Sequence, residues 1–387
     1  ASFTLKRPEV RILHRPQLWR AGRLVRIEKV EGSIPSESTA MTILFFSRLF
    51  LPHIGGVEKH VFELSKELIK KNYKIIVVTE KNQLNNSSAK ITGEIDGIKI
   101  YRIDAGGENV FKKFRVWWWL WQNRHLIENA DIVHCHDVFF WYIPFRFLYP
   151  NKPIYTTFHG YETKFPPSKK AIFIRKVSER LSWGNICVGD YIKKWYGTRP
   201  NLVTYGGVDI GKIRNLNIEI RNKIKILFIG RLEKDTGVLN YLKVLELMRK
   251  RKIKFDLEAC GDGSLKKMVE DYGKVNGFVD DLNTYIEKAD IVFASSYLSI
   301  LEAMAAKKLV FCAYDNKLKE DYLKMSPFAK WIVIEDSSTK LSDKVWYFIQ
   351  HKKEKDKVVH DAYEWVKKQT WKKVADRYIN LWGLQIL

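Results

Sequence analysis

The sequence predicts an α/β protein of two domains, each with a parallel sheet that is covered by helices on both faces. Apolar runs of strand length alternate with amphipathic helical segments through both halves of the chain, and this alternation is typical of parallel sheets. The opening pattern of strand, glycine-containing loop and helix returns from Ile224. The chain of 387 residues is also long enough to form two cores.

The stretch 41–79 carries the first βαβ unit. A short apolar run at 43–46 is followed by a loop with Gly55 and Gly56, a helix and a second apolar run at 75–78. The apolar stripe of the helix has spacings of four, three and four residues and consists of Val57, Val61, Leu64 and Leu68. A glycine pair before a helix lets backbone N–H groups and the positive helix end approach a phosphate. The stretch therefore predicts an anion site, although a glycine pair also occurs in ordinary tight turns.

The bulk composition restricts the class of protein. The formal charge of +23 indicates an anionic partner, such as nucleic acid, an anionic membrane or a phosphorylated substrate. No apolar run is long enough to cross a bilayer. The four cysteines lie far apart in apolar, strand-like segments: Cys135, Cys187, Cys260 and Cys312. This pattern predicts reduced core residues of an intracellular protein and disfavours structural zinc.

Two segments differ from the rest of the chain. Residues 1–40 are rich in arginine and end in a polar, turn-like stretch, and a new strand begins at Met41. We expect 1–40 to be a leader, an extension or a loosely attached arm outside the fold, with a basic membrane-binding arm as the functional alternative. The polar stretch 209–221 lacks periodicity and indicates a linker between domains at 41–212 and 213–368.

The stretch 111–130 predicts a helix in which four tryptophans lie beside basic residues: Trp117, Trp118, Trp119 and Trp121 beside Lys112, Lys113 and Arg115. Successive helical residues point about 100° apart, so these rings cannot all face one core. Exposed rings next to cations suit a lipid headgroup layer, and a helix packed on both sides is the alternative. The aromatic stretch 139–150 is expected to line an apolar pocket or to touch lipid.

Histidines end two consecutive predicted strands. The first strand begins at Ile132 and places His134 and His136 on one face, and the next strand ends at His159. Ligands of α/β sheets gather at the carboxyl ends of strands, so His136 and His159 are candidate functional residues. A zinc site is disfavoured, since no third ligand follows at a recognisable spacing.

The second half continues the alternation. A strand at 255–260 precedes a Gly-Asp-Gly turn and a helix, and a further strand precedes a helix from about Ser299 to Ala306. The sole acid of that last helix is Glu302. We place it near the helix start, where it accepts hydrogen bonds from ligand hydroxyls or favours the helix dipole.

Eight motifs together resemble the retaining glycosyltransferases of the GT-B fold, family 4, also called glycosyl transferases group 1. They occur in the family's order as GGVEKHV, HCHD, FHGYE, YGGVD, GRLEKDTG, ACGDGSL, GFVDDL and LEAMAAKK. The resemblance covers about residues 41–387. It implies two Rossmann-like domains facing across a cleft, with acceptor bound mainly by the first and sugar nucleotide by the second. It also implies that the final helix, at 369–387, packs back on the first domain.

The resemblance further implies a set of site residues. His136, Arg231 and Glu302 form the catalytic group, in which they hydrogen-bond the donor sugar, neutralise the diphosphate and hold the ribose, respectively. The other donor-binding residues are Gly55, Gly56, Lys234, Gly261 and Leu301, and the acceptor side has Glu58, His60 and His159. A fixed cation and a cradle of N–H groups stabilise the departing diphosphate, so the resemblance implies neither a metal nor a cofactor.

Two positions depart from the family pattern. Thr236 stands where the family usually has a lysine, and we expect Lys234 to reach the diphosphate in its place. Ala294 stands eight residues before Glu302, where the family usually has a second glutamate beside the donor sugar. This loss bears on the donor's identity and on catalysis.

We therefore expect a cytoplasmic hexosyltransferase of glycan biosynthesis that uses a UDP- or GDP-linked sugar. Its acceptor would be a glycan or lipid-linked, and the basic charge and tryptophans would recruit it to the inner face of an anionic membrane. The alternatives are an inactive relative, a sugar-nucleotide epimerase or a phosphorylase. A nucleic-acid binder is disfavoured, because the basic residues are dispersed and form no known nucleic-acid motif.

Overall fold

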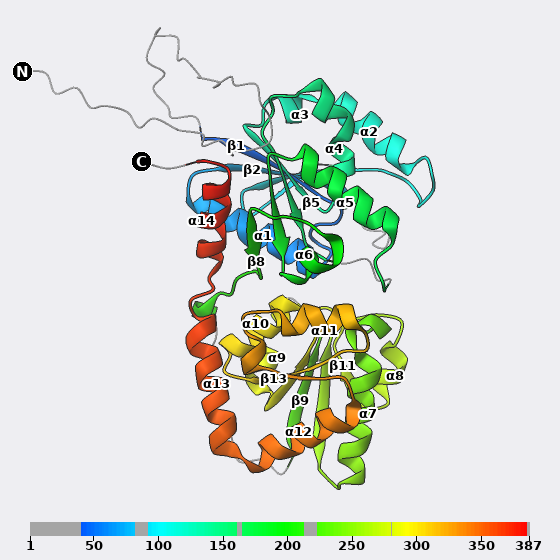
Figure 1. Ribbon diagram of the computed structural model, residues 1–387, viewed down its shortest axis with the longest axis vertical. Helices are drawn as coiled ribbons and strands as arrows, with labels where there is room; N and C mark the ends of the chain where they lie inside the picture. The colour runs from blue at the N-terminus through cyan, green and yellow to red at the C-terminus, as the bar shows by residue number, and fades with distance from the viewer. Residues whose placement is uncertain (1–39, 82–91, 161–164, 213–222, 280, 385–387) are drawn as a thin grey trace, which may run out of the picture.

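The computed structural model describes residues 40–81, 92–160, 165–212, 223–279 and 281–384. Figure 1 shows two α/β units stacked along the long axis of the molecule. Each unit has a sheet with helices against it, so the predicted α/β class is confirmed. The predicted leader, apart from residue 40, and most of the predicted linker at 209–221 lie outside the described residues.

The N-terminal unit contains an eight-stranded sheet in the order β3-β4-β2-β1-β5-β6-β7-β8. Its strands are β1 (Thr42–Ser47), β2 (Lys74–Glu80), β3 (Thr92–Ile95), β4 (Ile98–Ile103), β5 (Ile132–His136), β6 (Ile154–Phe158), β7 (Gly184–Val188) and β8 (Leu202–Thr204). All paired strands are parallel except β3 and β4. That antiparallel pair turns at Asp96 and Gly97, which both have positive φ.

The helices of the N-terminal unit cover both faces of its sheet. They are α1 (Gly56–Lys70), α2 (Lys112–Gln122), α3 (His125–Glu128), α4 (Phe139–Leu148), α5 (Lys169–Leu181) and α6 (Tyr191–Tyr196). The predicted stripe of α1 packs inward, since Val61, Leu64 and Leu68 are fully buried. A second core on the opposite face is formed under α2, α3 and α4.

The C-terminal unit contains a six-stranded, fully parallel sheet in the order β11-β10-β9-β12-β13-β14. Its strands are β9 (Ile224–Ile229), β10 (Phe255–Cys260), β11 (Gly273–Val275), β12 (Ile291–Ala294), β13 (Leu309–Ala313) and β14 (Val333–Glu335). Its helices are α7 (Val238–Lys250), α8 (Lys266–Glu270), α9 (Asn283–Lys288), α10 (Tyr297–Ala305), α11 (Lys317–Lys324), α12 (Ser338–Gln350) and α13 (Lys352–Val366), with short 3₁₀ turns at Ile210–Lys212, Lys234–Thr236 and Ala329–Trp331.

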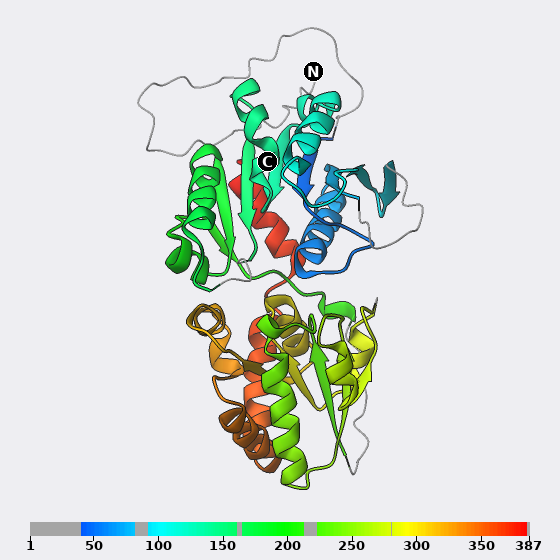
Figure 2. The same cartoon turned by 90° about the vertical axis from the view of Figure 1, so that its right-hand side faces the viewer.

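The last helix, α14 (Trp371–Leu381), crosses back to the N-terminal unit, as predicted. Figure 2 shows it, in red, within the upper unit. Its Trp371 and Tyr378 are buried in the same core as α1 and β1. The two crossings of the chain lie side by side, because the Val208 N–H donates to the Gln369 carbonyl at 2.8 Å. A Cβ at Gly207 would lie 2.7 Å from the Trp371 nitrogen, so this close approach requires glycine.

Three predicted segments differ in detail from the structure: the helix that contains Glu302, the tryptophan helix and the aromatic stretch 139–150. Helix α10 begins at Tyr297, two residues before the predicted start, so Glu302 lies in its second turn, away from the helix start. The predicted helix that contains the tryptophans is divided into α2 and α3. The aromatic stretch 139–150 is mostly helix α4, which has Pro144 inside it.

The cysteines and the apolar helices bear on the expectations drawn from composition. All four cysteines are buried and form no disulfide, as predicted. Within the described residues, no helix is both long and apolar enough to span a bilayer.

Candidate active site

The glycine loop ends at the start of α1, where Gly55 is the N-cap residue in an extended conformation. The N-cap Gly55 has no side chain to cap α1, and among residues 40–81, 92–160, 165–212, 223–279 and 281–384 no side chain bonds its first N–H groups, which can therefore face a ligand. A Cβ at Gly56 would meet no protein atom within 4 Å. Packing therefore does not explain the glycine there, and the open space leaves room for an anion to approach the helix end.

Glu58 lies on the other side of this loop. Its carboxylate folds back over Gly55, where an added Cβ would lie 2.3 Å from the Glu58 Oε2 atom. The carboxylate is buried, and its Oε1 atom lies 3.2 Å from Nδ1 of His53. The nearby Glu58 carboxylate raises the pKa of His53. Glu58 thus shapes the glycine loop, and its predicted place on the acceptor side stays a prediction.

Lys59 and Glu302 bring the two units together. Lys59 lies on α1 and forms an ion pair with Glu302 on α10. Glu302 is largely buried, with 15% of its side chain exposed, whereas Lys59 is 37% exposed. The predicted ribose-binding carboxylate therefore faces the start of α1 directly and has a cation from the other unit as its partner.

The two predicted histidines meet at the carboxyl ends of β5 and β6. Nδ1 of His136 lies 2.8 Å from Nε2 of His159. Burial holds the pKa of both imidazoles well below the usual range, and the neighbouring histidines lower it further. Both rings are therefore neutral at physiological pH. The Nε2 atom of His136 is buried without a hydrogen-bond partner among the described residues, so it is available to a ligand hydroxyl.

His60, predicted on the acceptor side, contacts the crossing helix α14. Its ring is buried between α1 and α14, where Nε2 lies 3.0 Å from the Tyr378 hydroxyl. The Trp371 ring packs edge-on against it with a centroid separation of 5.3 Å. His60 therefore anchors the crossing helix through Nε2, and its predicted place on the acceptor side stays a prediction.

Arg231 follows β9 at the carboxyl edge of the C-terminal sheet. Its guanidinium donates to the Asp235 carboxylate at 2.6 Å, and 54% of its side chain is exposed. Lys234 is exposed at the first position of the next 3₁₀ turn, and its contact with a diphosphate stays a prediction. Thr236 stabilises this turn, since its hydroxyl contacts the carbonyls of Arg231 and Glu233, each at 2.7 Å.

Two predicted donor-binding residues are packed against other protein atoms. Leu301 is fully buried in the core of the C-terminal unit, so its side chain does not reach a donor. Gly261 is buried where the chain after β10 meets the end of β9. A Cβ there would lie 1.9 Å from the Gly230 carbonyl oxygen, so backbone packing alone accounts for this glycine.

The sequence reasoning missed a polar cluster beside these residues. Ser295, just after β12, donates from its hydroxyl to the Thr236 carbonyl at 2.6 Å and lies 2.9 Å from the Tyr241 hydroxyl. The Lys319 ammonium donates to the Ser295 carbonyl at 2.5 Å. No local motif marks Lys319. Its only sequence signal is its place early in the helix that follows β13, at the edge of a parallel sheet where ligands gather.

A separate cavity of about 310 Å³ lies near the two chain crossings. Its lining includes Asp190, Tyr205, Thr370, Lys373 and Arg377 and none of the predicted site residues. The candidate site is therefore distinct from this cavity.

Known proteins are similar to this chain in sequence and in fold. Residues 54–212 match the family described as Glycosyltransferase Family 4, and residues 209–365 match Glycosyl transferases group 1. An uncharacterised glycosyltransferase of Methanocaldococcus jannaschii is 26% identical over 320 residues, which are 69% of this chain and 79% of that protein. The gpi3 subunit of Schizosaccharomyces pombe phosphatidylinositol N-acetylglucosaminyltransferase is 31% identical over 93 residues, which are 23% of this chain and 20% of that protein.

Among solved structures, Anabaena HepE in complex with UDP and glucose has a similar fold. The TM-score is 0.64 at 13% identity, and the match covers 88% of this chain and 98% of HepE.

Proposed function

The chain belongs to the group 1 glycosyltransferases of the GT-B fold, and on this basis we propose that it transfers a hexose from a nucleotide-diphosphate sugar to an acceptor hydroxyl. The observation that carries the proposal is the meeting of Glu302 with the start of α1 through Lys59. A carboxylate suited to ribose hydroxyls thereby lies next to a helix end suited to phosphate. The two groups match adjacent parts of a nucleotide diphosphate.

The remaining groups match the rest of such a donor. Arg231 supplies positive charge for the diphosphate, and the unpaired Nε2 of His136 is available to a sugar hydroxyl. In the proposed reaction, the acceptor hydroxyl attacks the anomeric carbon on the face from which the diphosphate leaves. The bond between sugar and phosphate breaks, and the acceptor's proton passes to the departing diphosphate. The anomeric configuration is then retained, and Arg231 with the α1 N–H groups stabilises the developing charge without a metal.

The donor nucleotide is proposed to be UDP or GDP. HepE, which shares the fold, is known in complex with UDP and glucose, and that complex supports a nucleotide-sugar ligand. The test is to incubate the protein with UDP- and GDP-linked hexoses, with and without glycan and lipid-linked acceptors, in the presence of EDTA. We expect acceptor-dependent nucleotide release and a product with the donor's anomeric configuration by NMR. Conversion of the free sugar nucleotide without acceptor would instead identify an epimerase.

One observation supports an inactive relative as the second candidate. Ala294 is fully buried at the end of β12, so no acidic side chain replaces the family's glutamate at this position. An inactive relative would bind the nucleotide sugar yet release no nucleotide with any acceptor. The assay above therefore distinguishes the two candidates.

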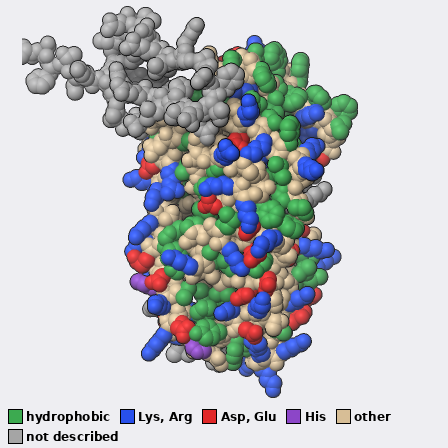
Figure 3. Space-filling model, viewed as in Figure 1, with side chains coloured by type: hydrophobic (Ala, Val, Ile, Leu, Met, Phe, Trp, Pro, Cys, Tyr) green, Lys and Arg blue, Asp and Glu red, His purple; other side chains and the backbone are tan. Residues whose placement is uncertain are grey.

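We also propose that the enzyme works at a membrane, through an exposed aromatic surface on α2 and α4. Its members are Phe111, Phe114, Trp118, Trp121, Phe140 and Phe147, each between 38% and 71% exposed. Figure 3 shows hydrophobic side chains gathered on the upper right of the N-terminal unit, where Figure 1 places these helices. Exposed aromatic rings on one face favour the interfacial layer of a bilayer. The relative from Schizosaccharomyces pombe, named for phosphatidylinositol, agrees with a lipid-linked acceptor.

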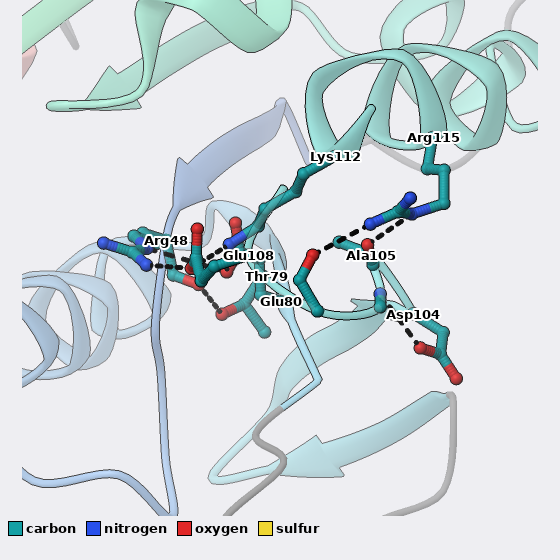
Figure 4. A network of polar contacts seen from close by, with 10 residues as sticks. Arg48, Thr79, Glu80, Asp104, Ala105, Glu108, Lys112 and Arg115 are labelled. Carbon is teal, nitrogen blue, oxygen red and sulfur yellow. Dashed lines mark hydrogen bonds and ion pairs between the residues drawn. The ribbon is translucent and has the colours of Figure 1, made fainter. Parts of the chain in front are cut away.

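The charges next to this surface differ from the expectation. Lys112 forms ion pairs with Glu80 and Glu108 at 2.7 and 2.6 Å, and Arg115 donates to the Ala105 carbonyl at 2.6 Å (Figure 4). These contacts fix the start of α2 on the sheet and engage both cations. We therefore expect the rings to contribute more to membrane binding than Lys112 and Arg115 do.

A further inference from the structure

Lys319 is a buried cation with no carboxylate partner in the part of the chain that the structure describes. The residue is 6% exposed, its Nζ donates to the Ser295 carbonyl at 2.5 Å, and Nζ lies 4.1 Å from the centre of the Tyr322 ring. Within the described ranges, no carboxylate comes within ion-pairing distance of this ammonium. A lysine ammonium has three N–H donors, and burying a charge is costly unless it is paired. The environment is thus suited to an arriving anion.

The position of Lys319 connects both departures from the family pattern. Ser295, which accepts its hydrogen bond, follows Ala294, where the family has a glutamate. The Ser295 hydroxyl donates to the Thr236 carbonyl at 2.6 Å, and Thr236 stands where the family has a lysine. The chain has threonine and no lysine at position 236, and the buried Lys319 is connected to Thr236 through Ser295.

Building on the proposed function, we infer that Lys319 contacts the donor diphosphate and supplies the positive charge that the family takes from the lysine at position 236. Lys319 lies on α11, just after β13, at the same carboxyl edge as Arg231 and Ser295. Extension of its ammonium past Ser295 would satisfy its remaining N–H donors with phosphate oxygens. Lys234, which is exposed, is then not needed for this contact.

The surroundings give this role a pH signature. Burial lowers the pKa of the Lys319 ammonium to about 8, whereas the Cys312 thiol, Asp235 and Asp315 act in the opposite direction and Arg231 adds to the lowering. A bound diphosphate would favour the charged form and raise that pKa. Above pH 8, diphosphate binding must be accompanied by protonation of Lys319. The affinity for the diphosphate therefore falls as pH rises, by at most about tenfold per pH unit for one proton.

The experiment first identifies which of UDP, GDP and ADP binds most tightly. Calorimetry then measures the affinity of the protein for that nucleotide and for its nucleoside from pH 7 to 9.5. For Lys319→Met we expect about 10- to 100-fold weaker diphosphate binding at pH 7, unchanged nucleoside binding and a flatter pH profile. Lys319→Arg should bind the diphosphate with a flatter profile too, since its charge does not titrate in this range. Lys317→Met is the matched control, because Lys317 is exposed on the same helix and paired with Glu320 at 2.7 Å.

A purely structural role would give a different pattern. If Lys319 acts on the diphosphate, Lys319→Met replaces an unpaired buried charge by an apolar side chain. The melting temperature of the protein without nucleotide should then be unchanged or higher. A lower melting temperature with unaltered diphosphate affinity and pH profile would overturn the inference and leave the proposed function standing. Absence of diphosphate binding by the unmodified protein would overturn both.

Discussion

Lys59 at the start of α1 and Glu302 in the second turn of α10 form an ion pair that joins the two units of the molecule. The same carboxylate is the proposed partner of the ribose hydroxyls. Lys59 therefore holds the group that the proposed donor would contact. A nucleotide would have to share Glu302 with Lys59 or displace it.

Substitution of either partner should separate these roles. We expect Glu302→Gln to weaken nucleotide binding about 10- to 100-fold, because a charged acceptor for two hydroxyls is lost. Lys59→Ala should change unfolding free energy by less than about 1 kcal/mol, as expected for a partly exposed pair, and should not weaken nucleotide binding. Calorimetric titration measures the nucleotide affinity of both variants, and denaturant unfolding measures the free-energy change of Lys59→Ala. Lys66→Ala, on the same helix and paired with Glu63, is the control. Equal loss of affinity in the Lys59 and Glu302 variants would show that the pair itself, and not Glu302 alone, is needed.

Tyr378 should contribute to stability through the crossing helix. Its hydroxyl lies 3.0 Å from Nε2 of His60 and 2.9 Å from the Thr157 hydroxyl, all in a buried setting. Tyr378→Phe removes the partner of His60 Nε2 and one of two contacts of the Thr157 hydroxyl, which also lies 2.8 Å from Nε2 of His134. We expect a loss of about 1–3 kcal/mol in unfolding free energy. Denaturant unfolding measures it. Tyr347→Phe removes a half-exposed hydroxyl bonded to Glu354 and should change stability by less than about 0.5 kcal/mol. Similar losses in both variants would contradict the account.

The buried histidines should make the fold sensitive to mild acid. Burial lowers the pKa of His60 and of His134 to about 3, whereas unfolded histidine has a pKa near 6.5. The stability from keeping these rings neutral is therefore complete above about pH 6.5 and falls as pH drops toward 3. Each ring should cost about 1.4 kcal/mol per pH unit below 6.5. Denaturant unfolding at pH 7 and pH 5.5 tests this. An unfolding free energy that does not change between pH 7 and pH 5.5 would mean that the rings take up protons in the folded protein. His125 is exposed, so the control variant His125→Gln should show the same pH dependence as the unmodified protein.

Local sequence patterns predicted the elements that depend on neighbouring residues. The stripe of α1 and the strand ending at His136 were visible because apolar spacing reports helix and strand directly. His136 and His159 were expected at the ends of two consecutive strands, and the structure adds that these strands are neighbours and that the two rings are in contact. The antiparallel β3 was missed, although the Asp96-Gly97 pair is a known signal for a tight hairpin turn.

Side-chain environments set by distant packing were not predictable in this way. His60 is buried by α14, whose Tyr378 is 318 residues further along the chain, and no local pattern reports that contact. Leu301 and Glu302 are adjacent in sequence, yet one enters the core and the other faces the N-terminal unit, because successive helical residues point about 100° apart. Which of the two faces the other unit depends on how α10 packs. Lys319 has no motif at all, and its importance emerges only from its burial and its contact with Ser295.

The aromatic surface should bind lipid through its rings. We expect the double variant Trp118→Ser and Trp121→Ser to lower sedimentation with vesicles of phosphatidylcholine and phosphatidylglycerol at least several-fold, because both rings are exposed. The fold should be unaffected, as judged by the melting temperature. Trp346→Ser is the matched control, since this tryptophan is 37% exposed on α12 in the C-terminal unit. Unchanged binding of the double variant, or no binding by the unmodified protein, would exclude this surface as the membrane contact.

The most direct test of the donor site is calorimetric titration with UDP, GDP and ADP, comparing the unmodified protein with Arg231→Ala and Arg251→Ala. Arg251 also pairs with an aspartate, Asp343, but lies at the far end of α7. The account predicts that one nucleotide binds clearly, that Arg231→Ala weakens it about 10- to 100-fold, and that Arg251→Ala leaves it unchanged. No binding of any nucleotide by the folded, unmodified protein, or equal affinity in all three proteins, would contradict a donor site at Arg231.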